Sequence, residues 1–251
     1  MRLTLLALCL FASSTLSAAE RVVERSIAVD PDVRFSIKSQ RGGLVITTAD
    51  VDTIELKARI EHDDRRVVDQ VEIEVANLGS TVAVDVDYNE PGFRLNFGLI
   101  GTREYQYPEV WFTVVLPRDA SLSVESHRSN LDLEVPSGRV DVTSHRGRGR
   151  ISGVRNNLKI DADRADFDIE VVELRDVDLE FDRGDIDLVL RNPSDFTVAG
   201  ETHRGSIRFR GRNYRINQSS RDSYVNVREG DGRNQINIMS HRGNTVIDFR
   251  D

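Results

Sequence analysis

A short polar corner recurs along the second half of the chain and limits the folds open to it. Four strong copies read Ser/Thr-His-Arg followed by Gly or Ser, and three weaker copies keep the arginine. The arginines follow one another at intervals of 17 to 21 residues: Arg128, Arg146, Arg164, Arg183, Arg204, Arg221 and Arg242. Self-similarity at this period is typical of a solenoid, in which each repeat buries its apolar face against its neighbours.

Alternating apolar residues flank most corners and predict strands. Leu122 and Val124 lead into the first corner, and Leu131 and Leu133 leave it. Because side chains alternate across a strand, these apolar residues point inward. We therefore expect an all-β protein, an N-terminal β-strand region continuing into a β-solenoid with about 18–21 residues per coil and two strands per coil. Helical character is confined to 67–75, whose later half alternates like a strand.

The first 19 residues have the pattern of a cleaved signal peptide. Arg2 precedes an apolar run, and small residues at 17–19 offer a cleavage site before Glu20. This apolar run is too short to span a membrane, and no second candidate follows it in the sequence. We expect secretion across the inner membrane to the periplasm or cell surface of a bacterium. The mature chain divides into a β region at 20–117, with an aromatic loop at 88–108, and solenoid repeats at 118–251.

Charge and cysteine content exclude several classes of protein. The formal net charge is -8, and loss of Arg2 with the signal peptide makes it -9. An acidic protein of this kind is not expected to bind nucleic acid or dock on anionic lipid. Cys9 is the only cysteine and lies in the signal peptide, so the mature chain has neither a disulfide nor a thiol nucleophile.

The repeated arginines are the first candidate binding site. Stacking of the repeats would place all seven in one column, and guanidinium groups form bidentate pairs with phosphates and carboxylates. The column is therefore a candidate anion ridge for phosphorylated or carboxylated glycans. The structural alternative is favoured at this stage, since seven unpaired cations at rung spacing would repel one another. It pairs the arginines with nearby acids: Asp132, Asp166, Asp168, Asp185 and Asp187.

Four of the five histidines precede these arginines. His127 and His145 belong to successive copies, whereas the copy at Arg221 separates His203 from His241 in sequence and, we expect, in space. A metal site needs three or four converging ligands. We expect turn histidines, with no metal and no cofactor.

Closely spaced carboxylates raise the possibility of catalysis. Glycosidases on β-helices use two acids about 5 to 9 Å apart. Here acids such as Asp166 and Asp168 alternate regularly with core residues, which is typical of a solvated strand face. We predict no catalytic residues, and keep a glycan-active hydrolase or lyase as the alternative.

An aromatic loop forms the second candidate binding surface. It contains Tyr88, Phe93, Phe97, Tyr105 and Tyr107. These rings could stack on sugars or dock a protein. The alternative is a hydrophobic cap, because solenoids need their end coils covered.

The last apolar run, 244–249, ends two residues before the last residue given. We expect it to be the final rung with an uncovered edge. Uncovered strand edges pair with other chains, so weak self-association through this rung is predicted.

The whole pattern resembles the bacterial "putative adhesin" family of secreted β-solenoid domains. The shared features are a strand pair around Arg41-Gly42-Gly43, an acidic hairpin, the apolar strand from Trp111 to Pro117, and repeats of turn-Gly-x-apolar-x-apolar. The resemblance implies a non-enzymatic envelope protein that binds a cell-surface glycan or an envelope protein. A periplasmic sensor or assembly factor that binds a protein partner is a further alternative.

Overall fold

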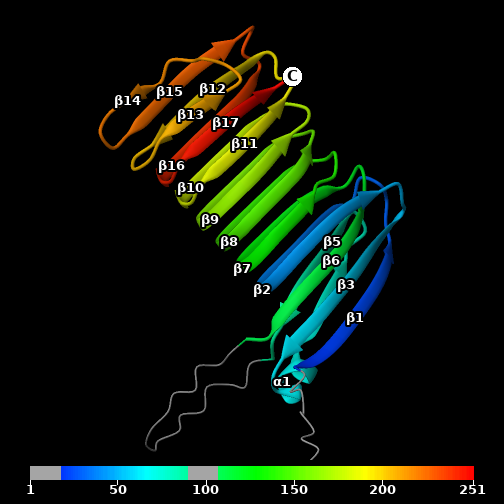
Figure 1. The fold of residues 1–251 in the computed structure, drawn as a ribbon. Helices are drawn as coiled ribbons and strands as arrows, with labels where there is room; N and C mark the ends of the chain where they lie inside the picture. The colour runs from blue at the N-terminus through cyan, green and yellow to red at the C-terminus, as the bar shows by residue number, and fades with distance from the viewer. Residues whose placement is uncertain (1–17, 90–106) are drawn as a thin grey trace, which may run out of the picture.

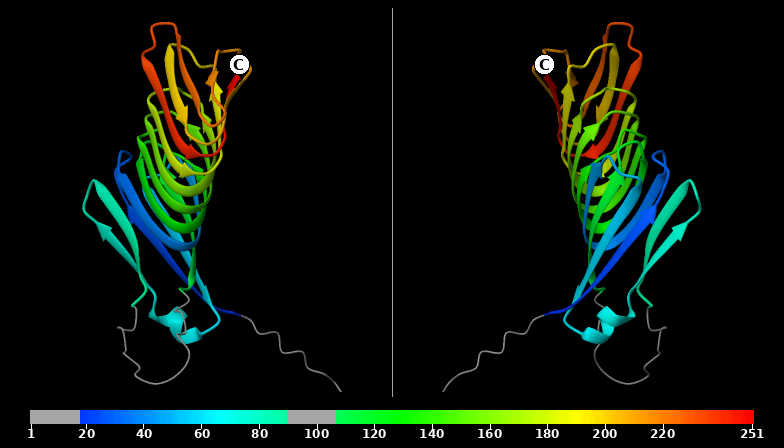
Figure 2. Two further views of the ribbon diagram at one scale, coloured as in Figure 1. Left: turned by 90° about the vertical axis from the view of Figure 1, so that its left-hand side faces the viewer. Right: turned by 90° about the vertical axis from the view of Figure 1, so that its right-hand side faces the viewer.

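The computed structural model describes residues 18–89 and 107–251. Seventeen strands form a single sheet in these residues, and α1 (Arg65–Gln70) is their one helix. The sheet is bent lengthwise, so that two arms face each other across the core and meet at a corner (Figure 2). The expected all-β class is confirmed. Within the described ranges no helix is long and apolar enough to cross a membrane.

Four long strands run through both arms and form the middle of the sheet (Figure 1). They are β2 (Arg34–Ala49), β7 (Ser121–Glu134), β8 (Val140–Val154) and β9 (Leu158–Val171), each parallel to the next. The prediction of two strands per coil is wrong for these rungs. Pairing continues through the corner, where Arg146 lies opposite both Arg128 and Arg164, so each rung is one bent strand.

The N-terminal strands extend both arms of the sheet on the side of β2 that faces away from β7. On the first arm β5 (Thr81–Asp87) pairs with β2 and forms the predicted hairpin with β4 (Glu72–Asn77). On the second arm β6 (Glu109–Pro117) pairs with β2, followed by β3 (Thr53–His62) and β1 (Ala19–Ala28). A short turn after β3 leads into α1, which Asp64 caps by accepting a bond from the Arg66 backbone N–H.

Beyond β9, each rung is interrupted at the corner and consists of two strands, one in each arm. These are β10 (Val177–Arg183) with β11 (Ile186–Arg191), β12 (Phe196–Thr202) with β13 (Ile207–Arg210), and β16 (Asn234–Arg242) with β17 (Thr245–Arg250). Their order in space differs from their order in sequence. β16 lies between β10 and β12, and β17 lies between β11 and β13. The C-terminal rung is therefore inserted into the sheet.

This insertion overturns the premise of the predicted self-association. Ile247 in β17 lies opposite Leu188 on one side and Phe209 on the other, and it is fully buried. The last rung has no free edge through which a second molecule could pair. The expectation was wrong because consecutive repeats do not all stack consecutively in the sheet.

The segment around Arg221 is not a rung either. It forms a turn between β14 (Asn217–Gln218) and β15 (Ser223–Glu229), and β15 runs antiparallel to β12. Val225 and Val227 therefore lie in a returning strand. Arg221 lies in this turn instead of in a rung, and its backbone carbonyl accepts a bond from the Gly205 N–H at 3.4 Å.

The core lies between the arms and follows the predicted alternation. Leu133, Ile169 and Leu188 are at most 2% exposed, whereas Asp168 beside them faces solvent. At the far end, Phe209, Tyr214 and Phe249 pack ring against ring with centroids 5.2 to 5.8 Å apart. Together these rings cover the last rungs of the core.

Candidate functional site

The corner exposes two consecutive side chains on every rung. In β7, Ser126 and Ser129 are buried, while His127 and Arg128 between them face outward. Strict alternation would send one of the two inward. The bend changes the phase of the strand, so that inward positions on both arms face the same core. A histidine or acid column and an arginine column therefore run side by side along the outside of the corner.

Small residues after each arginine make this bend possible. Gly147, Gly184 and Gly243 have φ between 140 and 144°. A Cβ at Gly184 would lie 1.9 Å from the Ala165 carbonyl oxygen. Both conditions require glycine. Gly205 is needed only for close approach, because its added Cβ would meet the Gly243 carbonyl oxygen at 1.7 Å.

Backbone pairing aligns the arginines in one column. Arg41, which the sequence argument left out, lies opposite Arg128 and begins it. Arg164 lies opposite Arg183, and Arg183 lies opposite Arg242. Arg204 is beside Arg242, since its carbonyl accepts a bond from the Gly243 N–H at 3.1 Å. We call this column the arginine ridge: Arg41, Arg128, Arg146, Arg164, Arg183, Arg242 and Arg204.

Most of the ridge arginines have no ionic partner among the described residues. Arg41 pairs with Glu109 at 3.3 Å and Arg183 with Asp182 at 3.6 Å. Within 18–89 and 107–251, no ion pair or side-chain hydrogen bond is made by the other five: Arg128, Arg146, Arg164, Arg204 and Arg242. The pairing favoured from the sequence is therefore wrong for these residues. These five arginines are exposed, and in the part of the chain that the structure describes their guanidinium donors have no partner.

The expected acidic partners have other contacts. Asp166 accepts a hydrogen bond from the Asp185 backbone N–H at 2.9 Å, and Asp185 accepts one from the Asn244 N–H at 2.7 Å. These carboxylates link neighbouring rungs beyond the corner instead of neutralising arginines. Asp132 and Asp168 lie opposite Arg150 on the outer face of the second arm, so their nearest cation belongs to a different column.

The second column consists of histidines and aspartates. Its order along the sheet is His127, His145, Asp163, Asp182, His241 and His203. His145 Nδ1 lies 2.7 Å from Asp163 Oδ2, and the rings of His127 and His145 stack with centroids 4.5 Å apart. His203 and His241 are also neighbours, at 5.3 Å, so the expectation that the Arg221 copy separates them is wrong.

Each of these histidines has a carboxylate within 4 Å. His127 lies 3.7 Å from Glu125, His203 lies 3.6 Å from Glu201, and His241 lies 3.9 Å from Asp182. Among the described residues, no group of three or more His, Cys, Asp or Glu side chains is arranged to hold a metal ion.

Shallow hollows border the arginine ridge on both sides. One is lined by His127, His145, Asp163 and Asp182 together with the arginines of their rungs. The other is lined by Gly42, Ser129, Asn130 and Gly147 together with Arg128 and Arg146. Both hollows are open to solvent. The candidate site is thus a line of exposed cations with a shallow, open hollow on each side.

The aromatic loop is described only at its two ends. Tyr88 is buried, and its ring packs edge-on against Tyr107 at a centroid distance of 5.3 Å. This packing ties the two ends of the loop together. Phe93, Phe97 and Tyr105 lie outside the described residues, so the proposed aromatic binding surface stays a prediction.

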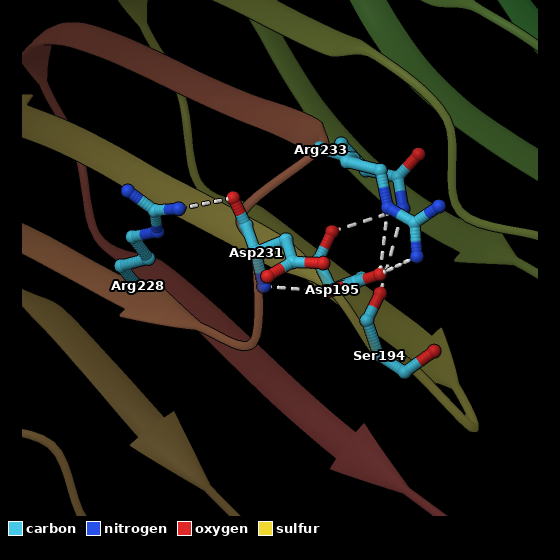
Figure 3. A network of polar contacts seen from close by, with 6 residues as sticks. Ser194, Asp195, Arg228, Asp231 and Arg233 are labelled. Atoms are coloured by element: carbon cyan, nitrogen blue, oxygen red, sulfur yellow. Dashed lines mark hydrogen bonds and ion pairs between the residues drawn. The ribbon is translucent and has the colours of Figure 1, made fainter.

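A polar clamp at the far end was missed by the sequence argument (Figure 3). The turn before β12 places Asp195 at φ 58°, where its carboxylate accepts bonds from the Asp231 backbone N–H and the Arg233 guanidinium. These bonds, the backbone bond first, lower the pKa of Asp195. The clamp joins two turns that are 36 residues apart in sequence. The pairing of β12 with β15 and β16 brings them together, since Phe196 lies opposite both Glu229 and Asn234.

The Toastrack DUF4097 family model matches residues 34–190, which is more than half of the chain. The chain belongs to the Toastrack DUF4097 family. The Toastrack match ends within β11, so the inserted C-terminal rung and the returning strand β15 lie beyond it. The ridge positions from Arg41 to Arg183 lie within the Toastrack match.

Several solved structures are similar to this Toastrack chain. A putative cell adhesion protein from Clostridium sporogenes ATCC 15579 is 12% identical with a TM-score of 0.48, covering 92% of this chain and 100% of its own. A putative adhesin from Bacteroides fragilis NCTC 9343 is 12% identical with a TM-score of 0.32, covering 91% and 97%. A putative lipid binding protein from Parabacteroides distasonis ATCC 8503 is 12% identical with a TM-score of 0.31, covering 92% and 97%. No curated protein matches the sequence. Likenesses this distant transfer no function.

Proposed function

We propose that this Toastrack chain is a non-enzymatic, secreted envelope protein that binds anionic glycans through the arginine ridge. In this proposal the rungs are the coils of a β-solenoid, and the solenoid serves as a scaffold that repeats one cation per coil. The observation that carries the proposal is the set of five ridge arginines without partners in the described residues. Exposed cations held in line without neutralisation cost stability, and a ligand that binds them offsets that cost.

The ligand chemistry follows from the guanidinium group. Its planar fork matches the two oxygens of a carboxylate, phosphate or sulfate and forms two parallel hydrogen bonds. The ridge arginines are exposed, so each contact contributes little and is weakened by salt. Binding therefore requires several contacts at once. Glycans of the cell surface that carry repeated anionic groups satisfy this requirement.

The catalytic alternative would place its acids on the outer face of the second arm. Asp168 and Asp187 face each other on the outer face of the second arm, and each alternates with buried residues along its strand. They form a solvated strand face, as the sequence pattern predicts. A protein-binding role has one feature in its favour: in the described chain β1 pairs only with β3, so its outer edge is open to a partner strand.

A glycan array combined with turnover measurements tests the proposal. We expect binding to sulfated, phosphorylated or uronate-containing glycans without cleavage, and weaker binding as salt is added. The double variant Arg146→Ala/Arg164→Ala should lose most of this binding. The matched control Arg155→Ala/Arg175→Ala removes the same charge at the turns away from the corner and should retain it. Cleavage of a glycan would favour the enzyme. Absence of both glycan binding and cleavage, together with a co-purifying protein, would favour the protein-binding role.

A further inference from the structure

The arginine ridge is linear, and its length places a condition on the ligand. Resting on the proposed anion-binding function, we propose that the ligand is a linear anionic oligosaccharide that lies along the stacking axis and spans several rungs. The seven ridge arginines from Arg41 to Arg204 lie on consecutive rungs. At about 4.8 Å per rung, the six intervals between them extend roughly 29 Å.

A linear ligand fits the ridge better than a compact anion. The arginines follow one another in a single column, so no three of them converge on one point. A single phosphate or sulfate reaches two neighbouring rungs at most. The open hollows on both sides of Arg128 and Arg146 leave room for a chain lying over the ridge. Extended contact along the column engages one anionic group after another.

The charges that flank the ridge disfavour a broad anionic surface. On the outer face of the first arm, Glu125, Asp161 and Glu180 lie in one column with Thr143. On the second arm, Asp132, Asp168 and Asp187 lie in another, interrupted by Arg150. A membrane of anionic lipids would meet these acids as well as the arginines. A narrow chain contacts the cations and avoids most of the acids.

The carboxylates nearest to the ridge are already engaged. Asp163 is bonded to His145 at 2.7 Å, and Asp182 lies near both Arg183 and His241. Both carboxylates therefore already have polar partners within the protein. Arg128, Arg146 and Arg164 form the longest uninterrupted run of unpaired ridge cations in the described chain, and we place the centre of the bound oligosaccharide there.

The test is a length series of heparin-derived oligosaccharides, from disaccharide to decasaccharide, titrated against the full chain at low salt. Each additional engaged arginine should raise affinity about two- to fivefold. The rise should level off once the oligosaccharide exceeds roughly 29 Å, the length of the ridge. Oligogalacturonates of matched length test whether carboxylates serve as well as sulfates.

Variants at separated positions sharpen the test. Arg128 and Arg242 are four rungs apart, roughly 19 Å. The double variant Arg128→Gln/Arg242→Gln should weaken a decasaccharide more than either single variant does. A disaccharide cannot reach both residues, so its affinity should fall no further in the double variant than in the more affected single one.

The outcomes separate this inference from the proposed function. Ridge-dependent binding whose affinity does not change with length would overturn the linear mode and leave anion binding intact. Absence of binding at every length would reject both. Binding to vesicles containing anionic lipid, with no binding to any oligosaccharide, would overturn the inference in favour of a membrane surface.

Discussion

Proline at position 247 tests the inserted position of the C-terminal rung. The residue Ile247 is 0% exposed and lies in the ladder between β11 and β13. The variant Ile247→Pro removes a ladder donor and introduces a ring that an interior strand does not accommodate. If β17 were a free edge, as its place in the sequence led us to expect, the same substitution would cost little.

The expected loss of stability can be worked from these contacts. Removal of the buried isoleucine side chain costs about 2–5 kcal/mol. The carbonyl that loses its donor adds about 1–3 kcal/mol. Together they amount to about 3–8 kcal/mol, against a total of about 5–15 kcal/mol for a typical domain. For a chain of this size the melting temperature should fall by about 6 °C or more.

The assay is thermal and urea denaturation of the variant beside Ile247→Val. The valine control keeps the donor and most of the volume, and should cost about 0.5–1.5 kcal/mol. Hydrogen exchange should also show loss of protection in β11 and β13, because both pair with β17. A proline variant as stable as the valine variant would refute the inserted rung.

Two further predictions concern the core and the clamp. Ile169→Asp places an unpaired carboxylate at a position that is 2% exposed and should lower the free energy of unfolding by several kcal/mol. Asp168→Asn on the outer face should lower it by well under about 1 kcal/mol. Equal shifts in the melting temperatures of the two variants would mean that the strand register is wrong. Because the pKa of Asp195 is lowered in the folded chain, its contribution to stability is present above the unfolded pKa of 3.8 and is lost as the pH falls below it. In the variant Asp195→Asn, the free energy of unfolding should therefore depend less steeply on pH below about pH 5. A pH dependence identical to that of the unmodified chain would reject the clamp.

The corner was predictable because it is a local feature repeated many times. The alternation around Leu133, Ile169 and Leu188 identified inward positions correctly, and the spacing of Arg128, Arg146 and Arg164 placed them on adjacent rungs. Period and polarity along one strand determine both results. Neither depends on which distant segment a strand meets.

Strand order and charge pairing were not predictable in the same way. The copy at Ser240-His241-Arg242 resembles the copy at Thr202-His203-Arg204, so the sequence holds no signal for which one lies against β10. The order depends on long-range contacts such as the clamp at Asp195. The predicted ionic partners of the arginines were wrong for a related reason. Asp166 and Asp185 are close to arginines in sequence, but their carboxylates accept bonds from backbone N–H groups of neighbouring rungs.

Observation of the arginine side chains themselves tests the ridge most directly. The measurement is a titration of the full chain, labelled with nitrogen-15, in which the Nε–Hε signals of the arginines are followed as a heparin hexasaccharide is added. The ridge account predicts shifts at Arg128, Arg146 and Arg164, which are unpaired in the described chain, and none at Arg155, which pairs with Glu173 at 2.6 Å. Unmoved ridge signals at a concentration where the hexasaccharide is bound would contradict it.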